Sequence, residues 1–265
     1  MYEVPPSPAN TQRRVAAHSP VHHLILHLER FVRLSSDDRG ALERLVAAPL
    51  VRAPARGDLV REGDPPDVVR LIIDGWACRY KDLPDGRRQI VGFFIPGDLC
   101  DLNVYILRQM DHGIGAITPV QYLAIPPEMI RELTHDHPRV AQALLWHQLV
   151  ESSVQREWLL NIGQRSAIER VAHLFVELYL RSSGVGLAQD HVFDFPLTQN
   201  DLAEATGITA VHVNRTVKEL RRLELIELGR KRLKILDLDR LKRLAMFNEN
   251  YLHLDREGRQ LDAND

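Results

Sequence analysis

The chain has 265 residues, of which 45% are hydrophobic and 26% are charged, and its formal net charge is −2 at pH 7. This length favours two domains with connecting helices, and the composition excludes a mainly disordered chain. Two cysteines cannot form a disulfide framework, and the sequence contains neither a secretion signal nor a run of about 18 apolar residues. We therefore expect a cytoplasmic protein without a membrane partner.

The N-terminal part of the chain predicts a tail followed by two short helices. Residues 1–20 are rich in proline and serine and lack periodicity, so we expect a mobile tail. Leu24, Leu28 and Phe31 recur at helical spacing, and a serine at position 35 or 36 can cap a second helix.

Short β-type runs separated by turns that contain glycine, proline and aspartate fill the region from about residue 50 to residue 126. Such a pattern is typical of an antiparallel barrel or sandwich, in which glycine supplies the positive φ angles of tight turns. The clearest predicted strands are residues 68–73, 76–80, 89–95 and 121–125.

A long helix is predicted to start near His137, and a second helix is predicted to start near Gln164. A long helix between two domains leaves much of its apolar face exposed, so we expect this face to pair with a second copy of the chain. A purely intramolecular core is the alternative. The predicted dimer contacts are Val140, Leu144, Val154 and Trp158, and the face is extended by Leu145, Leu149, Leu159 and Ile162.

The most specific motif lies between residues 198 and 228. Thr198 can cap a first helix, Gly207 supplies a turn, and Thr209 can cap a second helix. Apolar residues then fall where two such helices bury their contacts. This arrangement predicts a helix-turn-helix, the motif whose second helix enters the major groove of DNA.

The outward side of the second helix carries side chains suited to reading base edges. Arg215 can fork onto guanine, Asn214 can pair with adenine, and Val211 can contact a thymine methyl group, whereas Lys218 suits a phosphate. A solvated helix face without a partner is the alternative. The candidate DNA contacts in and around the two helices are Thr198, Thr209, Ala210, Val211, His212, Asn214, Arg215 and Lys218.

A basic turn follows this motif. Residues 209–234 contain eight lysines and arginines against three glutamates, a local excess of five positive charges. Arg230 and Lys231 occupy the turn between two short apolar runs, which predicts a β-hairpin wing whose cations contact the DNA backbone. A plain hairpin tip is the alternative.

These motifs, in this order, resemble the Crp/Fnr family of transcription regulators. In the barrel region the resemblance rests on Glu62-Gly63-Asp64, Ile73-Asp74-Gly75 with Tyr80, Asp85-Gly86 and Ile95-Pro96-Gly97-Asp98, and it covers about residues 25–245. It implies an α+β fold with an N-terminal double-stranded β-helix (jelly-roll-like) barrel, a long dimerisation helix and a C-terminal winged helix-turn-helix. The expected boundaries are a sensor domain at 21–135, the dimerisation helix at 136–163, the DNA-binding domain at 164–248 and a C-terminal tail at 249–265.

The part of the barrel that would hold an effector departs from the family pattern. Members that bind cyclic nucleotides carry Gly-Glu-Leu and, about ten residues later, Arg-Ser/Thr-Ala, where this chain has Cys100-Asp101-Leu102 and Asp111-His112-Gly113. An aspartate thus replaces the arginine that neutralises the phosphate. We expect no control by cyclic AMP, with a cyclic-nucleotide-responsive regulator with a diverged cassette as the alternative. The candidate effector-pocket residues are Asp101, Leu102 and His112.

The resemblance further implies a homodimer that binds an inverted repeat in double-stranded DNA and works with RNA polymerase. We expect no enzymatic activity, no cofactor and no metal. The histidines at positions 22, 23, 27, 135 and 137 lack a completing acid or cysteine, so surface or capping roles are expected for them. Cys78 and Cys100 are expected to be buried structural thiols, with redox sensing as the alternative.

Overall fold

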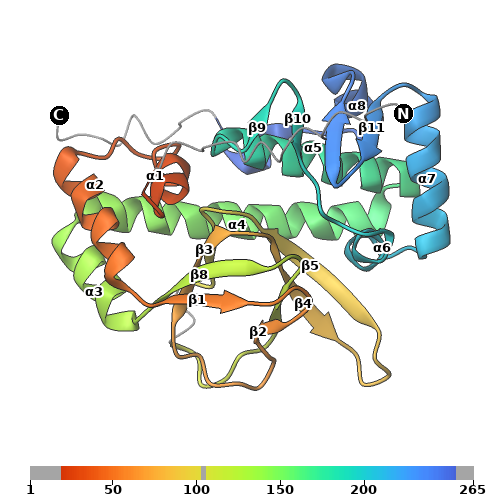
Figure 1. Cartoon of the computed structure of the whole chain (residues 1–265). Helices are drawn as coiled ribbons and strands as arrows, with labels where there is room; N and C mark the ends of the chain where they lie inside the picture. Colours follow the sequence, from red (N-terminus) through yellow and green to blue (C-terminus); the bar gives the residue numbers. More distant parts are fainter. Residues whose placement is uncertain (1–18, 103–105, 255–265) are drawn as a thin grey trace, which may run out of the picture.

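The computed structural model describes residues 19–102 and 106–254, so most of the predicted N-terminal tail lies outside the described residues. A long helix, α4 (Pro138–Gln164), runs across the molecule, with a β-roll on one side and a C-terminal domain on the other (Figure 1). Helix α4 therefore contacts both halves, as expected for a helix that connects two domains.

Short helices precede the roll in the chain. They are α1 (His22–Leu28), α2 (Ser36–Glu43) and the 3-10 helix η1 (Arg44–Ala47). The Ser35 side chain accepts from the Asp38 backbone N–H, and the Asp38 carboxylate accepts from the Ser35 backbone N–H, which completes a capping box. The predicted serine cap is thereby confirmed.

The roll consists of two four-stranded antiparallel sheets, in the orders β1-β8-β3-β6 and β2-β7-β4-β5, which confirms the jelly-roll-like barrel. At the turn between β3 and β4, Gly75 has a φ of +84°, and a Cβ there would lie 2.1 Å from the Pro119 carbonyl oxygen. Only glycine fits such a position. The strands are β1 (Leu50–Ala53), β2 (Asp58–Val60), β3 (Val69–Asp74), β4 (Ala77–Asp82), β5 (Arg88–Phe94), β6 (Leu99–Cys100), β7 (Gly113–Ala116) and β8 (Val120–Ile125).

The C-terminal domain follows α3 (Pro127–Asp136) and α4. Its strands form one antiparallel sheet in the order β11-β12-β10-β9, beside a helix-turn-helix. Its elements are α5 (Ala167–Gly184), β9 (Ala188–Gln189), β10 (Val192–Asp194), α6 (Gln199–Thr206), α7 (Ala210–Arg222), β11 (Ile226–Gly229), β12 (Arg232–Ile235), α8 (Leu238–Leu244) and the 3-10 helix η3 (Glu249–Leu252).

Two predictions about these elements need correction. The predicted dimer contacts Val140, Leu144, Val154 and Trp158 are at most 6% exposed in the single chain, because they face the chain's own core. Trp158 illustrates this, since its indole Nε1 donates to Glu177 of α5. The predicted tail at 249 also begins too early, because η3 packs against α4 and Leu252 is buried.

A buried ion pair joins the roll to the C-terminal domain. Arg181 of α5 donates from Nη2 to Oδ2 of Asp98 at 2.8 Å and to the Phe93 carbonyl oxygen at 2.9 Å. Asp98 also accepts from the Ile95 backbone N–H at 2.8 Å. Both charged groups are thus hydrogen bonded, which is the condition under which proteins tolerate buried ions.

We predict that Asp98→Asn lowers the free energy of unfolding by about 3–5 kcal/mol, because it leaves the Arg181 guanidinium buried without its carboxylate. Urea unfolding measures this decrease. Asp85→Asn is the control, since its pair with Arg87 is exposed and is worth about 0–1 kcal/mol. Equal decreases in the two variants would contradict the structural role of the buried pair.

Candidate nucleic-acid interface

The helix-turn-helix has the caps and the turn that its sequence predicts. Thr198 accepts from the Asp201 backbone N–H, and the Asp201 carboxylate accepts from the Thr198 backbone N–H at 2.7 Å. Gly207 ends α6 in the left-handed region with a φ of +67°. Thr209 then accepts from the His212 backbone N–H and starts α7. These bonds fix the path of the chain between the two helices.

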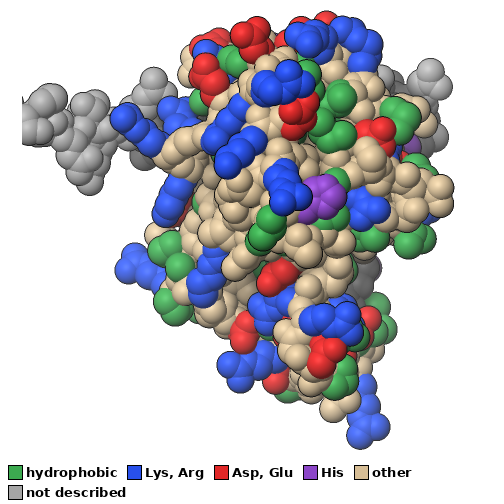
Figure 2. All heavy atoms as spheres, turned by 90° about the vertical axis from the view of Figure 1, so that its right-hand side faces the viewer, with side chains coloured by type: hydrophobic (Ala, Val, Ile, Leu, Met, Phe, Trp, Pro, Cys, Tyr) green, Lys and Arg blue, Asp and Glu red, His purple; other side chains and the backbone are tan. Residues whose placement is uncertain are grey.

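The predicted base-reading side chains lie together on the outward side of α7. Val211 is 65% exposed, and His212, Arg215 and Lys218 are also exposed, whereas Ala210 and Asn214 are partly buried. The opposite side of the helix carries the buried residues Val213, Thr216, Val217 and Leu220. Figure 2 shows the molecule from the side on which α7 lies, and lysine and arginine side chains are spread over this face.

The wing presents its cations at the tip of a tight hairpin. Gly229 pairs with Arg232 across the two strands, so Arg230 and Lys231 form a two-residue turn. Both have positive φ angles, 51° and 59°, as a turn of the I′ type requires. Their side chains are exposed. The hairpin predicted from the sequence is confirmed.

Ion pairing distinguishes the candidate DNA-contacting cations from several of their neighbours. Among the described residues, Arg215, Lys218, Arg230 and Lys231 form no ion pair. Nearby cations are paired with acids: Arg222 with Glu219, Arg232 with Asp194, and Lys234 with Glu227. The unpaired cations are therefore the ones available to phosphates and bases.

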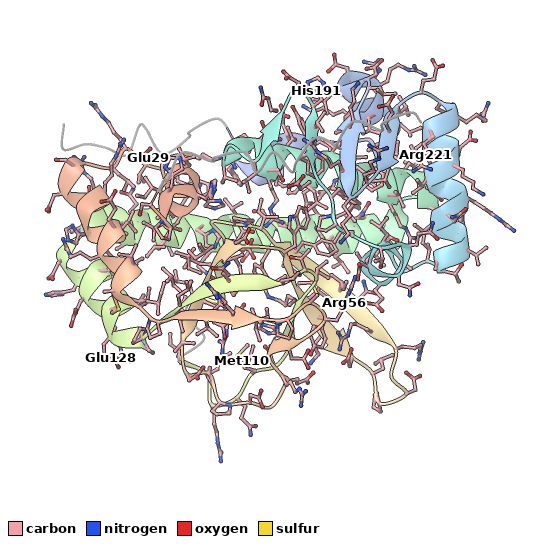
Figure 3. The ribbon with its side chains drawn as sticks, viewed as in Figure 1. Glu29, Arg56, Met110, Glu128, His191 and Arg221 are labelled. Atoms are coloured by element: carbon pink, nitrogen blue, oxygen red, sulfur yellow. The ribbon has the colours of Figure 1, made fainter. Side chains whose placement is uncertain are left out.

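A contact that the sequence did not indicate links the first helix of this motif to the roll. Arg56 donates from both terminal nitrogens to the two carboxylate oxygens of Asp201, and Gln89 of β5 donates to the Ala205 carbonyl oxygen. Arg56 is labelled in Figure 3, between the roll and α6. Burial raises the pKa of Asp201, but the hydrogen bonds from Arg56 and Thr198 outweigh this effect and hold that pKa below its ordinary value. No local pattern marks a pair that is so distant in sequence.

The candidate effector residues come together, but their polar groups bind one another. His112 Nε2 lies 2.8 Å from Asp101 Oδ2, and its Nδ1 lies 2.6 Å from Asp111 Oδ1. Burial lowers the pKa of His112, but these two carboxylates outweigh this effect and raise that pKa above its ordinary value. Leu102 is 4% exposed. The sequence did not indicate a further member, Arg79 of β4, which donates to Asp101 Oδ1 at 2.7 Å.

Within the described residues, no group of three or more histidine, cysteine, aspartate or glutamate side chains is arranged so that it could hold a metal ion. His137 lies at the start of α4 and faces Asp38 at 3.4 Å. The expected surface role of His27 is wrong, because its side chain is 13% exposed and its Nε2 lies 3.1 Å from His147 Nδ1.

Among the described helices, none is long and apolar enough to span a bilayer.

Comparison with known proteins agrees with both halves of this architecture. Residues 50–137 match the cyclic nucleotide-binding domain, and residues 169–244 match the Crp-like helix-turn-helix domain. The transcriptional activatory protein AadR of Rhodopseudomonas palustris is 31% identical over 218 residues, which cover 80% of this chain and 87% of that protein. The nitrogen fixation regulation protein FixK of Bradyrhizobium diazoefficiens is 31% identical over 175 residues, which cover 66% and 72%.

Among solved structures, FixK2 from Bradyrhizobium japonicum has a TM-score of 0.67, with 24% sequence identity, over 74% of this chain and 96% of its own. The roll, the long helix and the exposed recognition helix define a DNA-binding transcription regulator. The chain belongs to the Crp/Fnr family.

The two cysteines give a direct test of the redox alternative. Cys78 and Cys100 are at most 3% exposed, and burial raises the pKa of Cys78 to about 12 and that of Cys100 well above its ordinary value. Because the thiolate is the reactive form, we predict that a thiol reagent at about pH 8 labels neither cysteine in the folded protein and labels both in urea. Rapid labelling of either residue in the native protein would favour redox sensing.

Proposed function

We propose that the protein regulates transcription by binding an inverted-repeat DNA site as a homodimer, with RNA polymerase as a further partner. The observation that carries this proposal is the set of exposed, unpaired cations on α7 and on the wing turn. A twofold dimer presents two recognition helices, so the half-sites are expected about one helical turn, roughly 34 Å, apart.

An exposed apolar stripe on α4 supports dimerisation. Leu145, Leu149, Leu159 and Leu160 are between 46% and 75% exposed. Together with exposed Ser152, Arg156 and Gly163, the stripe follows the alternating spacing of three and four residues that is typical of paired helices. Exposed leucines on one side of a long helix favour burial against a second copy. The stripe lies opposite the four residues expected to make the main contact, and it contains three of the residues expected to extend that face, Leu145, Leu149 and Leu159.

We predict that Arg215→Ala weakens binding to a selected duplex by about 1–3 kcal/mol and relaxes the preference at one base pair in each half-site, because the substitution removes a bidentate bond to guanine. Random duplex DNA should be bound almost as before. Selection from random duplexes, followed by affinity measurements, tests this. Arg222→Ala is the control, because Arg222 is already paired with Glu219 on the same helix.

The wing cation should behave differently. Lys231→Ala is expected to weaken binding to specific and random duplexes by similar factors, and to reduce the slope of log affinity against log salt by about one unit, because one lysine–phosphate interaction disappears. A salt series on both duplexes measures this. An effect confined to the specific duplex would instead assign Lys231 to base reading.

The leucine stripe predicts the oligomeric state. Leu149→Lys combined with Leu159→Lys should give a folded monomer in light scattering, because two desolvated lysines oppose helix pairing. The control is Leu83→Lys, whose side chain is 51% exposed on the β4–β5 hairpin and outside the stripe. A monomeric wild-type chain at micromolar concentration, with or without DNA, would refute the dimer.

A further inference from the structure

A cluster of buried charges lies where the roll meets α4. Arg79 of β4 is 15% exposed and donates from Nη2 to Asp101 Oδ1 at 2.7 Å and from Nη1 to Glu151 Oε2 at 3.5 Å. Its guanidinium carbon also lies 4.9 Å from the centre of the Phe94 ring. One arginine thus connects β4, the loop after β6 and the long helix.

The backbone at Asp101 indicates that this arrangement is imposed rather than incidental. Asp101 has a φ of +55°, a left-handed conformation that is uncommon outside glycine. Both of its carboxylate oxygens are engaged, Oδ1 by Arg79 and Oδ2 by His112. Such strained conformations persist where surrounding contacts hold them, and they concentrate at functional sites.

The charges of the cluster oppose an anionic ligand. Burial raises the pKa of Asp101 and that of Glu151. Nearby Arg79 and His112 nevertheless hold the pKa of Asp101 below its ordinary value, and Arg79 does the same for Glu151. Two carboxylates therefore contact the Arg79 guanidinium. A cyclic nucleotide phosphate would have to displace Asp101 or Glu151 from Arg79 before it could bind there, and its negative charge would then lie beside the carboxylate that it displaced.

The cluster is also connected to the DNA-binding domain. From Glu151, the next turn of α4 carries Gln155, whose Nε2 donates to the Val91 carbonyl oxygen of β5 at 2.8 Å. One turn further, Trp158 donates to Glu177 of α5 at 3.1 Å. The position of α4 against the roll is thus linked, through successive turns, to the helix that precedes the helix-turn-helix.

We propose that Arg79 takes the place of a diffusible effector. By bridging Asp101 and Glu151, it holds the roll against α4 and keeps the helix-turn-helix in its DNA-binding orientation without a small molecule. This inference rests on the proposed function, because its regulatory consequence is measured on DNA. The bridge itself can be measured without DNA.

The test compares Arg79→Met, Glu151→Gln and the double variant with the wild-type protein in the absence of any added ligand. We expect Arg79→Met to weaken binding to the selected duplex at least about tenfold and Glu151→Gln to weaken it about threefold. The double variant should bind no more weakly than Arg79→Met alone, because both substitutions remove one bridge. Arg87→Met, at an exposed arginine of the same roll, should bind within about twofold of wild type.

The proposal would be overturned if Arg79→Met bound DNA with wild-type affinity. It would also be overturned if the fold-decreases in affinity of the two single variants multiplied in the double variant. Should Arg79→Met not fold, Arg79→Lys replaces it. Lysine keeps the charge but lacks the forked guanidinium that binds two carboxylates, so an intermediate decrease in affinity is expected.

Cyclic AMP provides a second test. A saturable rise in the melting temperature of the wild-type protein would show that the pocket accepts the nucleotide, and would also overturn the proposal.

Urea unfolding of the wild-type protein, the two single variants and the double variant separates this inference from the proposed function. Unfolding free energies that are not additive between Arg79 and Glu151 establish the bridge, whereas additive values refute it. A wild-type protein that selects no DNA sequence would overturn the proposed function, and the unfolding cycle would still decide whether the bridge exists.

Discussion

The buried ion pair between Asp98 and Arg181 is the contact on which the relative position of the two halves depends. Each buried ion costs several kcal/mol in lost hydration unless hydrogen bonds satisfy it. Here Asp98 binds the Ile95 backbone N–H, and Arg181 binds the Phe93 carbonyl oxygen. Any displacement of α5 from the roll would break both of these Arg181 hydrogen bonds, to Asp98 and to the Phe93 carbonyl oxygen, at once, so the pair opposes small movements more strongly than apolar contacts of the same area would.

Further buried polar groups continue from this pair towards the C-terminus. Glu177, one turn before Arg181, is completely buried and accepts hydrogen bonds from Trp158 of α4 and from the Tyr251 hydroxyl of η3. Arg165, between α4 and α5, donates to the Ala245 carbonyl oxygen. The connection between the long helix and the DNA-binding domain is therefore packed and hydrogen bonded. A recognition helix held on such a scaffold can place its side chains accurately against base edges.

Local signals in the sequence were sufficient for much of the fold and for most of the candidate interface. The Thr198 and Thr209 caps, the Gly207 turn and the basic hairpin each depend on residues within one or two turns of one another, and all four occur as predicted. The side of α4 that enters the core was not predictable in this way, because the helix carries apolar residues on both sides. The bridges from Arg56 to Asp201 and from Arg79 to Glu151 were also missed, since their partners lie 145 and 72 positions away in the sequence.

Ion pairing also bears on where a chain with a net charge of −2 can attract DNA. Several basic side chains near the interface have acidic partners, and an arginine from the roll covers Asp201 at the start of α6. Pairing reduces the attraction of these surfaces for phosphates, which otherwise drives binding to any sequence. Exposed cations without an ion pair are found on α7 and on the wing turn. If the protein binds DNA as proposed, discrimination between sequences rests on contacts between α7 and base edges.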